Sequence, residues 1–384
     1  MIVVQKFGGT SVGSIDRIRH CASLIEKERN LNNSVCVVVS AMAGQTNALL
    51  SLTSSFDDSD QTPFQDTIAS TGEIVSAGLL GLALNEIGIA SQTLSAWQVP
   101  ILATPSWGRA KITDIFPKKI ELLMEKGVVP IVTGFQGMTL SQELTTLGRG
   151  GSDTSAVAIA AVLSGARCDI YTDVDGIYSA DPRIVSRAFK YDFLSYEEVL
   201  EMTSFGAKVL HPRCVEIAQR YKVPLKVCSS FNSVEGTIVG EQKFMERFFI
   251  KAISSLRNRL WIKVSREVKL EVFSELLKKY EIEIDFLQLS NDGFSFCLSI
   301  DDWRRVSAFL PLGTEVFENL SCISLVGQGI KSNPEVLSRV LSLIGDRKIF
   351  SISLSDMRLS FLTSSDQAEG LVQRLHDHLI ETYA

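Results

Sequence analysis

The chain has 384 residues, of which 45% are hydrophobic and 21% are charged, and its formal net charge is -6. This length and composition are typical of a globular protein of two or three domains and exclude a disordered chain. The negative net charge argues against a general affinity for nucleic acids or anionic membranes.

The cysteines are scattered along the chain, and none of them forms a CxxC pair. This spacing favours reduced thiols in a cytoplasmic protein and argues against a zinc site. No uninterrupted apolar run reaches the roughly 18 residues of a membrane-spanning helix. The first residues also lack the layout of a signal peptide. We therefore expect a cytoplasmic protein that binds neither membranes nor nucleic acid.

Short apolar runs alternate with helical stretches through the first two-thirds of the chain. Strands are predicted at residues 2–4, 35–39, 128–133, 168–172 and 225–228, and helices at residues 16–29, 156–163 and 217–221. Continuous apolar strands that alternate with helices predict a mainly parallel sheet covered on both faces. In such folds ligands bind beyond the carboxyl ends of the strands, and glycine-rich turns follow several of these strands.

After residue 245 the pattern changes to short α+β units. A first unit reads strand, helix, strand, strand over residues 261–264, 268–280, 282–289 and 294–300. A second repeats this order over residues 322–326, 334–343, 349–354 and 357–363, before a final helix at 367–379. Asn333 followed by Pro334 is a helix-start signal. Two copies of one pattern predict a second region built from a repeated α+β unit.

The first candidate site is a glycine turn that directly follows the first strand. Gly8 and Gly9 allow a phosphate to approach backbone N–H groups, and Lys6 is placed to meet a transferring phosphoryl group. A plain strand-to-helix turn has the same pattern. The turn is not a P-loop, because no GxxxxGK[ST] sequence follows any strand.

The second candidate site, GRGGSDTS at residues 148–155, opens a predicted helix. Glycines at a helix start form an anion cradle. Arg149 is suited to holding a carboxylate through two hydrogen bonds, and Asp153 to holding an ammonium group or orienting Lys6. Alternatively, Asp153 only caps the helix and Arg149 is solvated.

The third candidate site is YTDVDGIY at residues 171–178, followed by DPR at residues 181–183. Its acidic residues are compatible with a metal site. Asp-Gly and Asp-Pro are also common turn sequences, and the 12-residue calcium loop is absent. Spacing alone therefore favours turns here.

Together these segments resemble the aspartokinase family. The matching motifs, in the family's order, are KFGGTSV at 6–12, SAMAGQTN at 40–47, STGE at 70–73, TLGRGGSDTSA at 146–156, YTDVDGIYSADPR at 171–183 and FGAKVLHP at 205–212. The resemblance implies a three-layer αβα amino acid kinase (carbamate kinase-like) domain with a mainly parallel sheet over residues 1–245. It also implies α+β ferredoxin-like ACT regulatory domains over residues 250–384, a first unit at 250–320 and a second at 321–384.

The resemblance also implies roles for individual residues. Lys6 and Asp153 would be catalytic. ATP would be bound by Lys6, Phe7, Gly8, Gly9, Thr172, Asp173, Tyr178, Arg183 and Lys208. The substrate would be bound by Ser40, Thr46, Glu73, Phe135, Arg149, Gly150, Gly151 and Ser152. No side chain is implied as a metal ligand, and Mg²⁺ would be held mainly by the phosphates of ATP.

The implied enzyme transfers the γ-phosphoryl group of ATP to the β-carboxylate of L-aspartate. This reaction begins lysine/diaminopimelate, threonine and methionine biosynthesis, with lysine or threonine as an effector at the ACT region of a homodimer. An aspartate carboxylate has a pKa of about 3.9 and needs no general base. No histidine lies within the three candidate sites, and we expect His211, before Pro212, to have a structural or capping role.

Two alternatives remain open from the sequence. One is a kinase of the same fold that acts on glutamate, N-acetylglutamate, carbamate or a nucleoside monophosphate. TSV after the first glycines and the RGGSD sequence favour aspartate, whose free amino group needs an acidic partner such as Glu73. The other is a non-catalytic amino-acid sensor, which the presence of Lys6, Arg149 and Asp153 disfavours.

Overall fold

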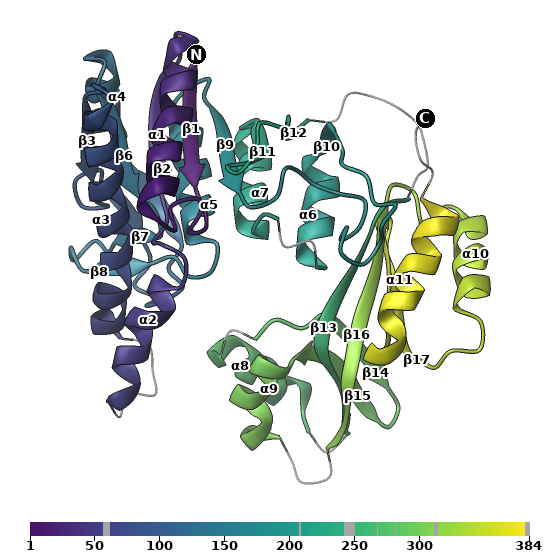
Figure 1. Ribbon diagram of the computed structural model, residues 1–384. Coiled ribbons are helices and arrows are strands. Elements are labelled where there is room, and N and C mark those ends of the chain that lie inside the picture. Colours follow the sequence, from purple (N-terminus) through teal and green to yellow (C-terminus); the bar gives the residue numbers. More distant parts are fainter. Residues whose placement is uncertain are drawn as a thin grey trace. The chain divides into compact units, whose positions relative to one another are not determined.

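The computed structural model describes residues 1–56, 62–206, 209–241, 250–266, 268–280, 282–310 and 314–380 (Figure 1). The chain forms two compact units. The first comprises Met1–Ile177, Lys190–Thr203 and Lys208–Phe244. The second comprises Tyr178–Phe189, Ser204–Ala207 and Met245–Ala384, so a short segment from within the kinase-like sequence packs with the later part of the chain.

An eight-stranded sheet forms the centre of the first unit. Its order is β10 (Phe193–Ser195), β12 (Thr237–Gly240), β11 (Leu225–Ser229), β9 (Arg167–Thr172), β1 (Ile2–Phe7), β2 (Ser34–Val39), β6 (Val129–Thr133) and β3 (Ser91–Leu94). The six strands from β11 to β3 are parallel, and only the β11–β12 pairing is antiparallel. The predicted mainly parallel sheet is therefore confirmed.

Helices cover both faces of this sheet. On one face, α1 (Ile15–Asn30) and α3 (Pro63–Glu86) bury Ile18 and Leu80 against Phe7 and the β-branched residues of β2 and β6. Lys6, which alternates with Phe7 along β1, instead forms an ion pair with α5 (Gly151–Val162). Since successive strand residues point to opposite faces, α5 covers the other face, where it packs with α7 (Pro212–Tyr221).

Local sequence explains where the main helices begin. Ser14 caps α1 by accepting a hydrogen bond from the Arg17 amide at 3.3 Å. α3 begins with a capping box between Thr62 and Gln65, and Pro63 occupies its first position. The unit also contains α2 (Gln45–Ser51), α4 (Lys118–Glu125) and α6 (Tyr196–Ser204).

α3 is the one helix in the described part of the chain with the length and hydropathy of a membrane span. Half of that segment is buried within the protein. Its apolar character is explained by packing, since Ala77, Leu80 and Leu84 lie in the core beneath the central sheet. Its inward face also carries two buried carboxylates, those of Asp66 and Glu73.

A small four-stranded sheet was not predicted from the sequence. Its order is β5 (Ile112–Ile115), β4 (Ile101–Ala103), β7 (Gln136–Met138) and β8 (Leu144–Thr146). Strands of three or four residues are too short to give a periodic hydrophobic pattern. This sheet matters for the site, because β8 leads directly into the glycine-rich start of α5.

A six-stranded antiparallel sheet forms the second unit, which confirms the predicted α+β region. Its order is β14 (Phe286–Ser290), β15 (Gly293–Ser299), β13 (Ile250–Ser265), β16 (Glu315–Gly327), β18 (Arg358–Ser364) and β17 (Ile349–Leu354). β13 and β16 are long enough to serve both predicted repeats. The Gln288 amide of β14 donates to the Ser351 hydroxyl of β17 at 2.9 Å, so the two edges of the sheet meet.

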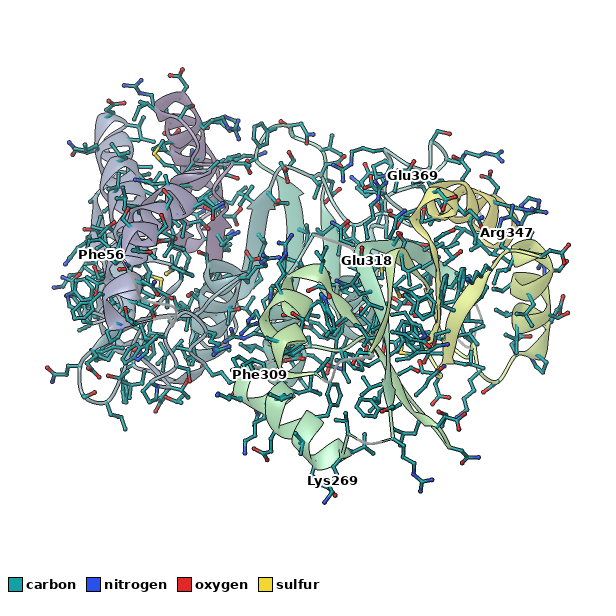
Figure 2. The ribbon with its side chains drawn as sticks, turned by 90° about the horizontal axis from the view of Figure 1, so that it is seen from below. Phe56, Lys269, Phe309, Glu318, Arg347 and Glu369 are labelled. Carbon is teal, nitrogen blue, oxygen red and sulfur yellow. The ribbon has the colours of Figure 1, made fainter. Side chains whose placement is uncertain are left out.

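Each half of this sheet has its own helical layer. α8 (Leu270–Tyr280) and α9 (Ile300–Val306) cover the cluster around Ile262 and Phe296. α10 (Pro334–Ile344) and α11 (Ser365–Leu379) cover the cluster around Phe361. Lys269 and Glu369 lie exposed on the outside of the unit (Figure 2).

The segment Tyr178–Phe189 belongs to this second core. Ala180 and Val185 are buried in the same cluster as Phe361. The Ile253 amide of β13 donates to the Ser179 carbonyl at 2.9 Å, and the Ser179 hydroxyl lies 2.9 Å from Nε2 of the buried His376 in α11. Long-range packing, rather than a local signal, therefore assigns the segment to the second unit.

Candidate active site

The Lys6 side chain lies where the central strand meets the start of α5. Its Nζ is 2.6 Å from Oδ1 of Asp153, and the two side chains are only 9% and 14% exposed. Strand alternation explains the position, because it points Lys6 to the face that α5 covers. The sequence prediction left open whether Asp153 orients Lys6 or only caps the helix, and the structure brings the two charges together.

The glycine turn after β1 is closely packed. The Gly8 amide donates to the Tyr171 carbonyl at 3.1 Å, so this N–H is already used within the protein. A Cβ atom on Gly9 would lie 2.9 Å from the Ala41 carbonyl oxygen. The Phe7 side chain is fully buried and stacks on Tyr171 with 4.8 Å between ring centroids, so it faces the core. Glycine is thus required here by packing as well as by any approach of phosphate.

The start of α5 presents Arg149 between two glycines in the left-handed region. Gly148 has φ +74° and Gly150 has φ +68°. A Cβ atom on Gly150 would lie 2.3 Å from the Cβ of His211, so no larger residue fits. Arg149 itself is exposed at the edge of a cavity. This geometry holds a guanidinium at the positive end of a helix, a suitable place for a carboxylate.

A cavity of about 310 Å³ lies next to these groups in the first unit. It collects every residue that the resemblance assigns to the substrate, together with both predicted catalytic residues. Its lining consists of Lys6, Ser40, Ala41, Thr46, Glu73, Phe135, Gly148, Arg149, Gly150, Gly151, Ser152 and Asp153. Positions that are far apart in the sequence therefore share one pocket, and the pocket contains two cations and two acids.

Glu73 is the buried acid of this cavity, with an exposed fraction of 3%. Its Oε1 accepts a hydrogen bond from the Ala41 amide at 3.0 Å. Its Oε2 is buried and has no hydrogen-bond partner within the described ranges. Burial raises the pKa of the Glu73 carboxyl to about 7, and the hydrogen bond from Ala41 opposes this rise. A ligand cation that reached Oε2 would favour the ionised form.

The residues predicted to bind the nucleotide are divided between the two units. Thr172 ends β9, its carbonyl accepts from the Ser230 amide at 3.0 Å, and its hydroxyl donates to Asp173 at 3.1 Å. Tyr178 and Arg183 belong to the segment that packs in the second unit, where Arg183 pairs with Asp181 at 2.7 Å. Lys208 lies outside the described residues.

Two residues near the cavity were missed from the sequence. Ala41 supplies the amide that holds Glu73. Asp66, two turns before Glu73 on α3, is 2% exposed and accepts hydrogen bonds from the segments around Gly108 and Thr146. The signal for Asp66 was available, because a carboxylate seven residues before Glu73 lies on the same side of an otherwise apolar helix.

His211 plays the structural role that was predicted for it. It is the N-cap of α7, with Pro212 at the first helical position, and its ring nitrogen accepts from the Arg213 amide at 3.4 Å. Its side chain also packs against Gly150. His211 therefore supports the glycine loop through its contact with Gly150.

Comparison with known proteins agrees with this geometry. The model of the Amino acid kinase family matches residues 1–229. An aspartokinase from Rickettsia felis is 40% identical, with 98% of each chain covered, and aspartokinase 2 from Bacillus subtilis is 38% identical, with 98% of this chain and 97% of the relative covered. The chain belongs to the aspartokinase family. The predictions of an aspartokinase and an enzyme are thereby confirmed, and the sensor alternative is excluded.

Solved aspartokinase structures share the fold over the full length. Aspartokinase III from Escherichia coli in complex with aspartate and ADP (R-state) has a TM-score of 0.85 and 28% identity, covering 99% of this chain and 100% of that one. The same enzyme in complex with lysine and aspartate (T-state) has a TM-score of 0.79 with the same identity and coverage. Both units of this aspartokinase chain therefore have counterparts in an enzyme of the family.

We predict that Gly150→Ala disrupts the active site of this aspartokinase. A left-handed alanine costs about 1–2 kcal/mol, and the new Cβ would also overlap His211. Loop displacement should lower turnover at least about tenfold. The measurement is aspartokinase activity together with the free energy of unfolding.

The matched control is Gly165→Ala, which has a similar φ of +73° but no atom within 4 Å of the added Cβ. This variant should lose a similar amount of backbone stability while it keeps its turnover. Equal turnover in the two variants would contradict the packing of Gly150 against His211.

Proposed function

We propose that this enzyme transfers the γ-phosphoryl group of ATP to the β-carboxylate of L-aspartate, which gives 4-phospho-L-aspartate and ADP. The observation that carries this proposal is the buried Glu73 oxygen in the cavity wall, unpartnered within the described part of the chain. A buried acceptor of this kind favours a ligand that brings a cation. The ammonium of a free amino acid supplies one, whereas N-acetylglutamate, carbamate and nucleoside monophosphates do not.

Arg149 supplies the complementary contact for the α-carboxylate of the substrate. It lines the same cavity as Glu73 and lies at the N-terminal end of α5, next to the buried Ser152. A guanidinium binds a carboxylate through two parallel hydrogen bonds, and the helix end adds a favourable dipole. Glu73 and Arg149 together would hold the amino-acid head group and leave the β-carboxylate free to react.

The β-carboxylate acts as the nucleophile. One of its oxygens forms a bond to the γ-phosphorus while the bond from that phosphorus to the β,γ-bridging oxygen breaks, so ADP leaves. The carboxylate is ionised at pH 7, and the obstacle is repulsion between two anions rather than proton removal. The Lys6 ammonium lies 2.6 Å from Asp153 and would neutralise part of this charge.

The nucleotide is proposed to bind beyond the carboxyl ends of β1 and β9, with Thr172 and Asp173 among its contacts. No three His, Cys, Asp or Glu side chains gather as metal ligands in the described ranges. In this proposal Mg²⁺ would be held mainly by phosphate oxygens and water. Mg²⁺ bound there would neutralise part of the triphosphate charge.

We further propose that the second unit is a tandem ACT-like regulatory region controlled by lysine or threonine. Support comes from two helical layers that share β13 and β16, and from the lysine complex of the similar Escherichia coli enzyme. Coupling of this kind typically amounts to about 1–3 kcal/mol. We expect a cytoplasmic homodimer that catalyses the first step of lysine/diaminopimelate, threonine and methionine biosynthesis.

The test of the activity is hydroxamate formation. The purified chain is incubated with Mg-ATP, hydroxylamine and either L-aspartate, L-glutamate or N-acetyl-L-aspartate. We expect hydroxamate with L-aspartate alone, because the acetylated acid has no ammonium for Glu73 and glutamate places its carboxylate one methylene further away. Hydroxamate with glutamate but not aspartate would overturn the substrate, and none with any acid would overturn the transfer reaction.

We predict that the KM for aspartate depends on the ionisation of Glu73. With a pKa of about 7, Glu73 is largely protonated at pH 6 and largely ionised at pH 8. Only the ionised form pairs with the ammonium, so the KM should be about tenfold higher at pH 6 than at pH 8. The measurement is the KM for aspartate at saturating ATP across this pH range.

Glu73→Gln is the control, because it keeps the shape of the side chain and cannot ionise. Its KM should be high and should not change over the same range. A pH dependence that persists unchanged in this variant would assign the titration to another group.

A further inference from the structure

The Asp66 carboxylate is a buried group that the proposed reaction does not use. It lies in the first turn of α3 and is 2% exposed. Its Oδ2 accepts from the Thr146 amide at 2.7 Å, the Gly108 amide at 2.9 Å and the Thr145 hydroxyl at 3.2 Å. Its Oδ1 accepts from the Thr146 hydroxyl at 2.9 Å. One carboxylate thus receives four hydrogen bonds.

These hydrogen bonds fix the beginning of the loop that carries Arg149. Thr146 is the last residue of β8, and only Leu147 and Gly148 separate it from Arg149. The Gly108 segment packs directly on this loop, because a Cβ atom on Gly148 would lie 2.6 Å from the Gly108 carbonyl oxygen. Asp66 therefore clamps together two segments that support one another.

A second side chain holds the same two segments from α7. The Arg213 guanidinium donates to the Leu147 carbonyl at 2.7 Å and to the Ala110 carbonyl at 3.0 Å. The Ala110 amide also donates to the Thr146 carbonyl at 2.9 Å. The strand end before Arg149 is thus anchored on several sides, which limits how far the backbone that carries Arg149 can shift.

The spacing on α3 relates this clamp to the substrate site. Asp66 and Glu73 are seven residues apart, two helical turns, and both are buried on the same side of α3. Glu73 lines the cavity itself, and Asp66 holds the loop that brings Arg149 to the same cavity. A single rigid helix therefore sets the distance between the two groups proposed to bind the head group.

We propose that Asp66 is a positioning residue that sets the affinity for aspartate by fixing Arg149 relative to Glu73. The proposal rests on the proposed function, in which Arg149 binds the α-carboxylate. Asp66 is not among the residues that line the cavity, and it would act through its hydrogen bonds with Gly108, Thr145 and Thr146. Misplacement of a substrate-binding group by a small distance reduces its contribution strongly.

The same hydrogen bonds indicate that an isosteric substitution can test the role of Asp66. In Asp66→Asn, the amide oxygen can occupy the position of Oδ2 and keep its three donors. The new NH₂ group then donates to the Thr146 hydroxyl, which can act as acceptor. Asp66→Ala instead leaves the amides of Gly108 and Thr146 without their acceptor. If hydrogen bonding is what matters, asparagine restores the function that alanine loses.

The experiment measures the KM for aspartate, the KM for ATP and kcat in Asp66→Ala, Asp66→Asn, Arg149→Ala and the Asp66→Ala/Arg149→Ala double variant. We expect Asp66→Ala to raise the KM for aspartate about tenfold, with the KM for ATP unchanged. Asp66→Asn should stay within about twofold of the unaltered enzyme. In the double variant the KM should equal that of Arg149→Ala, because coupled residues are not additive.

Glu198→Ala is the matched control for the loss of a buried carboxylate. Glu198 is 6% exposed and accepts from the Ser195 amide at 3.0 Å at the start of α6, away from the cavity lining. It should lose stability and keep its KM for aspartate.

The outcomes separate this proposal from the proposed function. Additive effects in the double variant, or an unchanged KM in Asp66→Ala while the unaltered enzyme forms hydroxamate, would overturn the positioning role alone. An Asp66→Asn variant as impaired as Asp66→Ala would assign the effect to charge and also overturn it. If Asp66→Ala does not fold, Asp66→Ser and Thr146→Val test the same hydrogen bonds. An unaltered KM for aspartate in both would reject the proposal.

Discussion

The ion pair between Lys6 and Asp153 is the interaction on which the active site depends. It joins the end of the central strand to the first turn of α5, and little of either side chain is exposed. Loss of one partner would leave a buried charge without compensation, which is far more costly than loss of a surface pair. The pair also restrains the Lys6 side chain, because other rotamers would move the ammonium away from Asp153.

Other elements of the first unit place the remaining charged groups around the same cavity. α3 supplies the buried Glu73, the glycine loop supplies Arg149, and His211 holds that loop through its contact with Gly150. The cavity therefore contains both acidic and cationic side chains, which an amino acid with one ammonium and two carboxylates would need. Such a site works by fixed charge and position, so the absence of histidine from its lining follows from the chemistry proposed for it.

The parallel sheet and part of the candidate site were predictable from the sequence, because both leave local sequence patterns. Continuous apolar strands predicted the parallel sheet, and the glycine sequences around Lys6 and Arg149 predicted residues that the structure places in one cavity. Most of the failures share one cause, which is that long-range packing leaves no local signal. Burial of Ala180 and Val185 in the second core and the short strands of the small sheet depend on distant partners. The position of Asp66 on α3 had a signal in the helical spacing, but the hydrogen-bond partners of Asp66 did not.

The most direct test of the account is the kinetic effect of Lys6→Ala, with folding checked by circular dichroism. The account predicts that kcat falls by about 10²–10³-fold or more, since the proposed role of Lys6 is to neutralise charge that develops during transfer. The KM for ATP should change far less, because backbone groups and Mg²⁺ would share the binding of the phosphates. A folded variant with unchanged kcat would contradict the role of Lys6. A variant that lost only ATP affinity would make Lys6 a binding residue and not a catalytic one.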